Sequence, residues 1–228
     1  MIERLKYLYR AYKYRYVKDS NEIDFALKHI QTGDTIVDIG CHKGAYLYWF
    51  EKATGKKGQI FGFEPQVKLF NYLKKIKTLQ HYNNVTLENK GLSIEEGTAS
   101  FFIPKTKSGT SPGASIEESE ASHLHEKVEI KITTLDKYFF EKETFPTLIK
   151  LDVEGHEKKV LQGGLKLLKA CRPAIIMECE NRHLQDETVF DVFEVLTQIG
   201  YKGYFYKNNE LVDLSEFKIE THQKIGEG

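Results

Sequence analysis

Thr35-Ile36-Val37-Asp38-Ile39-Gly40-Cys41-His42-Lys43-Gly44 is the stretch that decides the fold of this chain. A β-branched, apolar run of this kind is typical of a buried parallel strand, and here it ends directly in a glycine turn. Gly40 lets the chain turn sharply, and Gly44 lets a ligand or a helix approach the backbone closely. A helix over 45–52 is expected to follow the turn.

The sequence on either side repeats the alternation of strand and helix. A β-α-β-α-β order predicts the α/β class, with a doubly wound, mostly parallel, Rossmann-like sheet and helices on both faces. The expected further strands are 59–64, 85–89, 148–152, 174–178 and 201–206, and the expected further helices are 22–31, 67–79, 156–169 and 189–199.

One region breaks this alternation. Residues 98–103 and 128–133 are predicted to be strands without a helix between them. The polar segment 104–127 that joins them is long for a loop, and it is interpreted as either a flexible lid or plain surface.

Composition favours one soluble domain of ordinary size. The 228 residues divide into an N-terminal helical segment, 1–33, packed on a domain over 34–228. The formal net charge is zero, which gives no argument for a nucleic-acid partner. Three cysteines without C-x-x-C spacing, no apolar run of transmembrane length and no secretory signal predict a cytoplasmic protein.

The first residues form a basic, aromatic pattern. Leu5, Leu8, Tyr9, Tyr12 and Tyr16 recur at helical spacing, so an amphipathic helix is expected over 2–16. This helix either packs across the domain with its basic side chains solvated, or it contacts a membrane surface or an anionic substrate. Packing is the preferred interpretation, because tyrosine is a weak membrane anchor without Trp or Phe beside it.

The glycine turn predicts the kind of cofactor. It reads D-x-G-x-x-x-G and lacks the G-x-G-x-x-G pattern of a dinucleotide site. An acidic residue such as Asp38 repels a pyrophosphate but suits a cationic ligand, which favours S-adenosylmethionine over NAD. Glu64 ends the next strand, 20 residues after Gly44, and can bind both ribose hydroxyls or cap the helix that begins at Pro65. Asn89 ends the third strand, either near the adenine or as a turn residue.

A second group of polar residues follows two later strands. Asp152 and Glu154 are expected to share one face, as are Glu178 and Glu180, because side chains alternate along a strand. Carboxylates at one sheet edge suit removal of a proton from a hydroxyl. A divalent metal held by Asp152, Glu180 and Asn181 is a weaker alternative.

Other residues of this group have structural alternatives. His156 could act as a base near neutral pH, or it could be a hydrogen-bonded structural residue. Glu154 and Glu157 could cap the following helix.

Together these motifs resemble the FkbM family of S-adenosylmethionine-dependent methyltransferases. The most specific part is the run from Ile149 to Glu157, continued by 160–164; Thr134-Leu135-Asp136, Glu64-Pro65 and 89–92 also match in place and order. The resemblance implies a seven-stranded methyltransferase sheet and O-methylation of a small-molecule or glycan hydroxyl. One departure is Cys41-His42, where the family usually has Ala-Asn.

These arguments assign residues to two roles. Asp152 is the first candidate for the base, with Glu154, His156 and Glu178 as substitutes, in an in-line displacement on the sulfonium methyl. A nicotinamide-dependent oxidoreductase and a non-catalytic S-adenosylmethionine-binding adaptor are the alternative functions. The predicted cofactor-binding residues are Asp38, Gly40, Cys41, His42, Gly44, Ala45, Glu64, Pro65, Asn89 and Asp152.

Overall fold

The computed structural model describes residues 2–106, 110–111, 113–117, 124–184 and 186–223. Its centre is a five-stranded, fully parallel sheet with the strand order β3-β2-β1-β7-β8. This arrangement confirms the predicted doubly wound α/β class. The strands are β1 (Thr35–Ile39), β2 (Gln59–Phe63), β3 (Val85–Glu88), β7 (Leu148–Leu151) and β8 (Ala174–Met177).

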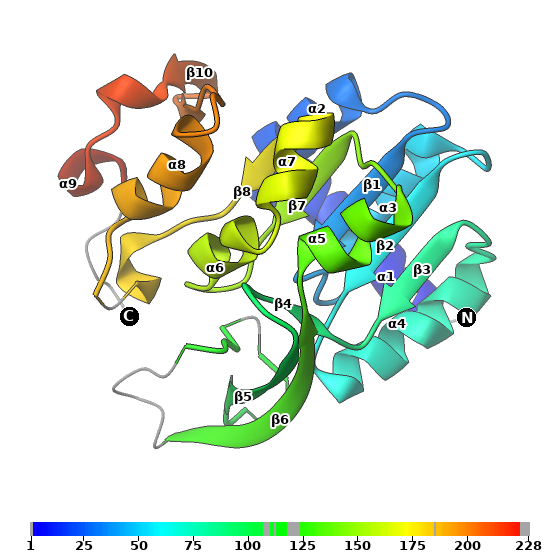
Figure 1. Ribbon diagram of the computed structural model, residues 1–228. Helices are drawn as coiled ribbons and strands as arrows, with labels where there is room; N and C mark the ends of the chain where they lie inside the picture. The colour runs from blue at the N-terminus through cyan, green and yellow to red at the C-terminus, as the bar shows by residue number, and fades with distance from the viewer. Residues whose placement is uncertain (1, 107–109, 112, 118–123, 185, 224–228) are drawn as a thin grey trace.

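Helices cover both faces of this sheet (Figure 1). Alternation along β1 explains why both faces are apolar: Ile36 is buried in one core cluster, and Val37 and Ile39 are buried in the other. The first cluster packs under α1 (Ile2–Lys13), the π-helix η1 (Tyr14–Lys18), α2 (Ser20–His29), α3 (Ala45–Thr54) and α4 (Val67–Gln80). The second packs under α5 (Leu135–Tyr138), η3 (Phe140–Lys142), α6 (Glu157–Gln162), α7 (Leu165–Cys171) and α8 (Val189–Thr197).

The expectation of seven strands in the sheet was wrong: the main sheet has five in the described part of the chain. After β8 the chain leaves the sheet through η4 (Asn181–His183) and α8. The late strand then forms as β9 (Tyr204–Lys207), which pairs antiparallel with β10 (Glu210–Asp213). The two residues between them, Asn208 and Asn209, have φ of 51° and 66°, the left-handed conformation of a tight hairpin. The backbone hydrogen bonds of β9 are therefore made to β10 instead of to a strand of the main sheet. The elements η5 (Leu214–Glu216) and α9 (Ile219–His222) follow it.

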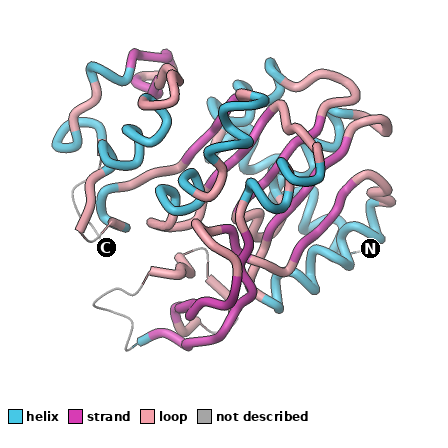
Figure 2. Tube along the Cα trace, viewed as in Figure 1, coloured by secondary structure: helices cyan, strands magenta, loops and turns pink. Residues whose placement is uncertain are grey.

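A second sheet, with the order β4-β6-β5, projects beyond the main sheet (Figures 1 and 2). Its strands are β4 (Gly91–Leu92), β5 (Gly97–Pro104) and β6 (His125–Thr133), so the two strands expected without an intervening helix are present. We call the β5–β6 hairpin, with its connecting segment, the flap. Within that segment, residues 107–109, 112 and 118–123 lie outside the described residues. Ser115 of the described part pairs with Phe102 of β5 through two backbone hydrogen bonds.

The N-terminal helix packs on the domain through an unexpected face. Tyr7 and Ala11 are fully buried, whereas Leu5 and Tyr9 of the apolar pattern are 60% and 70% exposed. The hydroxyl groups of Tyr7 and Tyr82 lie 3.3 Å apart, and the small Ala11 allows its carbonyl oxygen to accept a hydrogen bond from the Trp49 indole at 2.9 Å. No helix within the described residues is long and apolar enough to cross a membrane.

Candidate functional site

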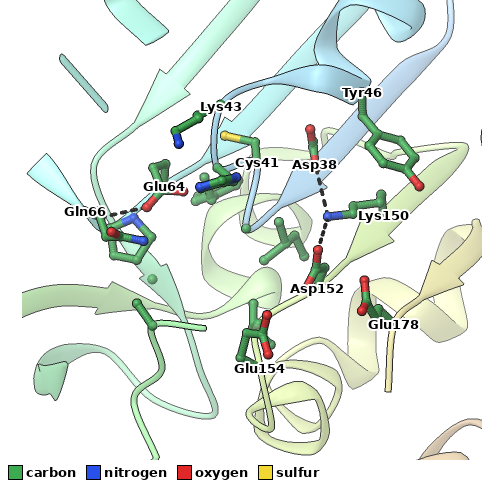
Figure 3. A pocket seen from close by; sticks show the side chains of 18 of the residues that line it. Asp38, Cys41, Lys43, Tyr46, Glu64, Gln66, Lys150, Asp152, Glu154 and Glu178 are labelled. Atoms are coloured by element: carbon green, nitrogen blue, oxygen red, sulfur yellow. Dashed lines mark hydrogen bonds and ion pairs between the residues drawn. The ribbon is translucent and has the colours of Figure 1, made fainter. Parts of the chain in front are cut away.

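A pocket of about 400 Å³ lies at the carboxyl ends of β1, β2, β7 and β8. This is the edge at which open α/β sheets bind ligands. Figure 3 shows carboxylates from the ends of several strands entering the same space. Of the predicted residues, Gly44, Asn89, Glu180 and Asn181 do not line the pocket, whereas Asp38, Gly40, Cys41, His42, Ala45, Glu64, Pro65, Asp152, Glu154, His156 and Glu178 do.

The two glycines of the turn serve different contacts. Gly40 has φ +76°, and a Cβ there would lie 1.8 Å from the backbone oxygen of Asp152. Gly44 has φ +72°, and a Cβ there would lie 2.8 Å from Leu73 and 3.5 Å from Tyr7. Gly40 therefore lets the ends of β1 and β7 come into contact. Gly44, which does not line the pocket, lets Leu73 of α4 and Tyr7 of α1 pack against the turn.

Asp38 is a buried carboxylate without a hydrogen-bond donor. It is 1% exposed, neither oxygen accepts a hydrogen bond, and the nearest cation, the Lys150 ammonium, lies 3.9 Å away. Burial raises the pKa of Asp38 to about 6, although the charge of Lys150 acts in the opposite direction. A buried carboxylate that accepts no hydrogen bond indicates a ligand that carries donors or positive charge.

Lys150 is held between two acids (Figure 3). Its ammonium donates to Asp152 at 2.8 Å. Burial lowers the pKa of Lys150, but the charges of Asp152 and Asp38 outweigh it and raise the pKa above its ordinary value. Asp152 is therefore tied to a fixed cation.

Glu64 is the second buried acid of the pocket. It is 3% exposed, and its Oε1 accepts a hydrogen bond from the backbone N–H of Gln66 at 2.8 Å. Burial raises the pKa of Glu64 to about 8, while hydrogen bonds from the backbones of Gln66 and His42 act against this. The N-cap of α4 is Gln66, so the alternative role of Glu64 as a helix cap is not realised.

Asn89 holds the loop that carries Glu64. Its amide donates to the backbone oxygens of Glu64 and Pro65, both at 2.9 Å. Asn89 therefore positions the wall of the pocket instead of contacting its contents.

The ends of β7 and β8 carry two further carboxylates. The predicted alternation was wrong here, because the strands end at Leu151 and Met177 and Glu154 has φ +55°. Glu154 and Glu178 nevertheless both line the pocket. Burial, followed by the charge of Asp152, raises the pKa of Glu154 to about 8 and that of Glu178 to about 7.

The hydrogen bonding of these two residues differs. The Glu154 carboxylate lies 3.0 Å from His183 Nε2. Among the described residues, the Glu178 carboxylate has no hydrogen-bond or ion-pair partner.

His156 is engaged at both ring nitrogens. Its Nδ1 lies 2.5 Å from a Glu117 oxygen and its Nε2 lies 2.9 Å from the Ser93 hydroxyl, and the residue is 2% exposed. The hydrogen bond with His156, opposed by burial, lowers the pKa of Glu117 to about 2. This geometry favours the structural interpretation of His156, which joins the flap to the domain. Glu157 lies in the first turn of α6 and accepts hydrogen bonds from the backbones of Val153 and Gly155, which precede the helix, so it fixes the turn after β7 instead of capping α6.

Comparison with known proteins gives the family. The methyltransferase FkbM domain matches residues 38–206, most of the chain. The chain belongs to the FkbM methyltransferase family. The predicted class, an S-adenosylmethionine-dependent methyltransferase, is thereby confirmed, and the oxidoreductase alternative is set aside.

One of the similar solved structures shares the fold at low sequence identity. The methyltransferase FkbM of Methylobacillus flagellatus KT aligns with a TM-score of 0.58 and 16% identity over 87% of this chain. This chain spans 45% of that protein. A putative rRNA-methylase from Clostridium thermocellum (TM-score 0.48, 17% identity) covers 84% of this chain and 87% of its own. A SAM-dependent methyltransferase from Aquifex aeolicus (0.45, 14%) covers 81% of each chain. No curated protein matches this chain.

Of the three proposed metal ligands of this FkbM domain, Asp152 lines the pocket, whereas Glu180 and Asn181 do not. Asp152 pairs with Lys150, and Glu180 pairs with Arg182 and His183. The Asn181 side chain accepts from the backbone of Val189. Within the described ranges there is no group of three or more His, Cys, Asp or Glu residues that could hold a metal ion.

Sequence reasoning missed several residues of the methyltransferase pocket. Gln66 and Lys150 stood within or beside recognised motifs, so their position was a usable signal. The N-terminal segment gave no such signal, because its helical pattern does not reveal which side faces a pocket. It contributes Arg10, Tyr14, Lys18 and Asp19.

Proposed function

We propose that this domain transfers the methyl group of S-adenosylmethionine to a hydroxyl of a small molecule or a glycan. The family supports methyl transfer, and the carboxylates at the ends of β7 and β8 support oxygen as the acceptor atom. A neutral alcohol needs a base during the transfer, since it is scarcely ionised at neutral pH.

The residues at the ends of β1 and β2 fit the methyl donor. The Asp38 carboxylate, which accepts no hydrogen bond, suits an ammonium group, and the buried Glu64 carboxylate can accept hydrogen bonds from a ribose diol. When bound, S-adenosylmethionine supplies an electrophilic methyl group. The pocket volume of about 400 Å³ lies within the ordinary range for a ligand of this size.

Glu178 is the best candidate for the base. Asp152, the first candidate from sequence, is fixed by the Lys150 ammonium at 2.8 Å, which weakens it as a proton acceptor. Glu178 has no such partner in the described residues, and its pKa is raised to about 7, near the working pH of a general base. Glu154, next to it in the pocket, is engaged with His183.

The flap supplies one wall of the acceptor side. Ala114 and Ile116 line the pocket, Ser115 donates to the Glu154 backbone at 2.7 Å, and Glu117 contacts His156. In our proposal the segment 104–127 acts as a lid that excludes water from the reaction.

The observation that carries this proposal is the unpartnered Glu178 carboxylate with a pKa near neutrality. Its test uses methyl-labelled S-adenosylmethionine and a fractionated cell extract as the source of acceptor. We expect Glu178→Gln to lower kcat by about 10²- to 10⁴-fold, because that is the usual contribution of a general base. Wild-type turnover should rise with pH through about 7, as Glu178 loses its proton, and the variant should lack this rise.

Glu180→Gln is the matched control, because Glu180 lies two residues away but outside the pocket. Donor affinity, measured by calorimetry, should be unchanged in both variants. If Glu178→Gln turned over as fast as wild type and kept the same pH dependence, Glu178 would be rejected as the base. Label found on nitrogen would reject O-methylation, and donor binding without labelled product from any fraction would favour the adaptor.

A further inference from the structure

The N-terminal segment presents an apolar stripe to solvent. Ile2, Leu5, Tyr9, Tyr12 and Tyr16 fall on one helical face, opposite the buried Tyr7 and Ala11. We call these five residues the outer stripe. They are 67%, 60%, 70%, 47% and 65% exposed, and Val17 beside them is 73% exposed. A run of large apolar and aromatic side chains this continuous marks a contact surface.

Basic side chains flank the outer stripe. Residues 2–18 contain six basic residues and one acidic residue, Glu3. Two of the basic residues are used inward: Arg10 donates to the Tyr72 hydroxyl at 3.1 Å, and Arg15 pairs with Asp24. In the described part of the chain, the exposed Arg4, Lys6 and Lys13 form no ion pair. The free positive charge therefore lies beside the apolar stripe.

The fold adds a tryptophan to this surface. The half-buried Trp49 of α3 packs against Tyr12 and Tyr16, with ring centroids 5.2 Å and 6.3 Å apart. Sequence alone disfavoured a membrane contact because no Trp or Phe stands beside these tyrosines in the chain. Folding places one there, and Trp with Tyr is the pair that concentrates at membrane–water interfaces.

We propose that the outer stripe and its flanking basic residues are a docking surface for an anionic lipid membrane. An amphipathic helix with aromatic and aliphatic residues on one side and Lys or Arg beside them lies in the plane of such a surface. The helix α1 has 12 residues, short of the ~20 needed to span a bilayer, so it lies along the surface.

Charge argues against a second copy of the chain as the occupant. Pairing two outer stripes would bring two sets of unpaired arginine and lysine side chains together, with only Glu3 of each segment to offset them. An anionic lipid surface instead attracts each nearby Lys or Arg by about 1 kcal/mol.

The test is co-sedimentation of the full chain with vesicles. One set contains phosphatidylcholine alone, and the other contains equal parts of phosphatidylcholine and phosphatidylglycerol. We expect binding to the anionic vesicles that weakens as salt is raised. Leu5→Ser with Tyr9→Ser, and separately Lys6→Glu with Lys13→Glu, should each weaken binding by about tenfold or more.

A matched control variant, Lys166→Glu with Lys169→Glu, reverses the charge of two exposed lysines of α7 on the other face of the sheet. This variant should bind within about twofold of wild type, because α7 lies away from the docking surface. Calorimetry with S-adenosylmethionine on every variant separates this proposal from the proposed function, which the outer stripe should not affect. Absence of wild-type binding to anionic vesicles, or equal weakening by the α7 control, would overturn the proposal. If wild type bound no vesicles but formed a dimer, and the double variant Leu5→Ser with Tyr9→Ser dissociated that dimer, a second copy of the chain would cover the outer stripe.

Discussion

The two halves of the pocket are built differently. At the ends of β1 and β2, Asp38 and Glu64 are almost completely buried, and a tight turn fixes the backbone beside them. At the ends of β7 and β8, Glu154 is half-buried and Glu178 is exposed, and the wall beside them comes partly from the flap. We call these the donor half and the acceptor half.

The difference follows from what each half is proposed to bind. A donor half for one invariant ligand can be rigid, and it can keep a carboxylate without hydrogen bonds that the ligand satisfies. The flap, which forms one wall of the acceptor half, contacts the domain through side chains that include Glu117, paired with His156 and Lys159. Variation there would change the acceptor without disturbing the donor site.

Gly40→Ala should have the largest effect on stability, because the new methyl group would clash where the end of β1 contacts the end of β7. The new Cβ would lie 1.8 Å from the Asp152 backbone oxygen, at a φ of +76° that L-residues rarely adopt. We expect the free energy of unfolding to fall by more than about 3 kcal/mol, measured by urea denaturation.

Gly33→Ala separates the two causes of that loss. Gly33 has φ +98°, but a Cβ there would meet nothing within 4 Å. It should therefore lower stability by only about 1 kcal/mol, from backbone strain. Equal losses in the two variants would show that the close contact between β1 and β7 contributes nothing.

Asp38→Asn should sharpen the description of the donor half. We expect the affinity for S-adenosylmethionine, measured by calorimetry, to fall about 10- to 100-fold, because a buried charged acceptor is lost. Glu141→Gln, an exposed change outside the pocket, should leave this affinity unaltered. Unchanged affinity in Asp38→Asn would remove Asp38 from the donor site.

The same variant should stabilise the ligand-free protein. Burial raises the pKa of Asp38 from its ordinary value of 3.8 to about 6, so the folded state binds its proton more tightly than the unfolded state does. Wild-type stability therefore falls as pH rises from about 4 through about 6. Above that range the free energy of unfolding, measured in urea, should be about 1–2 kcal/mol higher for Asp38→Asn than for wild type. Below pH ~4 this difference should vanish.

The donor half could be predicted from sequence because its signals are local. A strand, a glycine turn and an acid at the next strand end depend on neighbouring residues, and Asp38, Gly40 and Glu64, which were predicted to bind the cofactor, all line the pocket. The family motif around Asp152 was recognised in the same way.

The rest depends on contacts between residues far apart in the chain. The pairing of His156 with Glu117 and the location of Lys150 between two acids cannot be read from spacing. Helical periodicity correctly marked an apolar stripe on α1, but the buried side is set by Tyr7 and Ala11 meeting α3 and α4. The two missing strands of the main sheet likewise reflect β9 pairing with β10.

Glu117→Gln should have the smallest of these effects, and it tests how the acceptor half is held. The hydrogen bond with His156 lowers the pKa of Glu117 from its ordinary value to about 2, so its ionised form stabilises the folded state. That stabilisation is present above pH ~4.5 and is lost as pH falls through about 2. In urea at pH 7 the variant should lose about 1 kcal/mol, since the pair is partly solvated. The loss should shrink toward pH 3, and Glu95→Gln, an exposed change near Ser93, should show none. If Glu117→Gln matched Glu95→Gln at pH 7, the contacts of Glu117 with His156 and Lys159 would not hold the flap, and the flap would need another anchor.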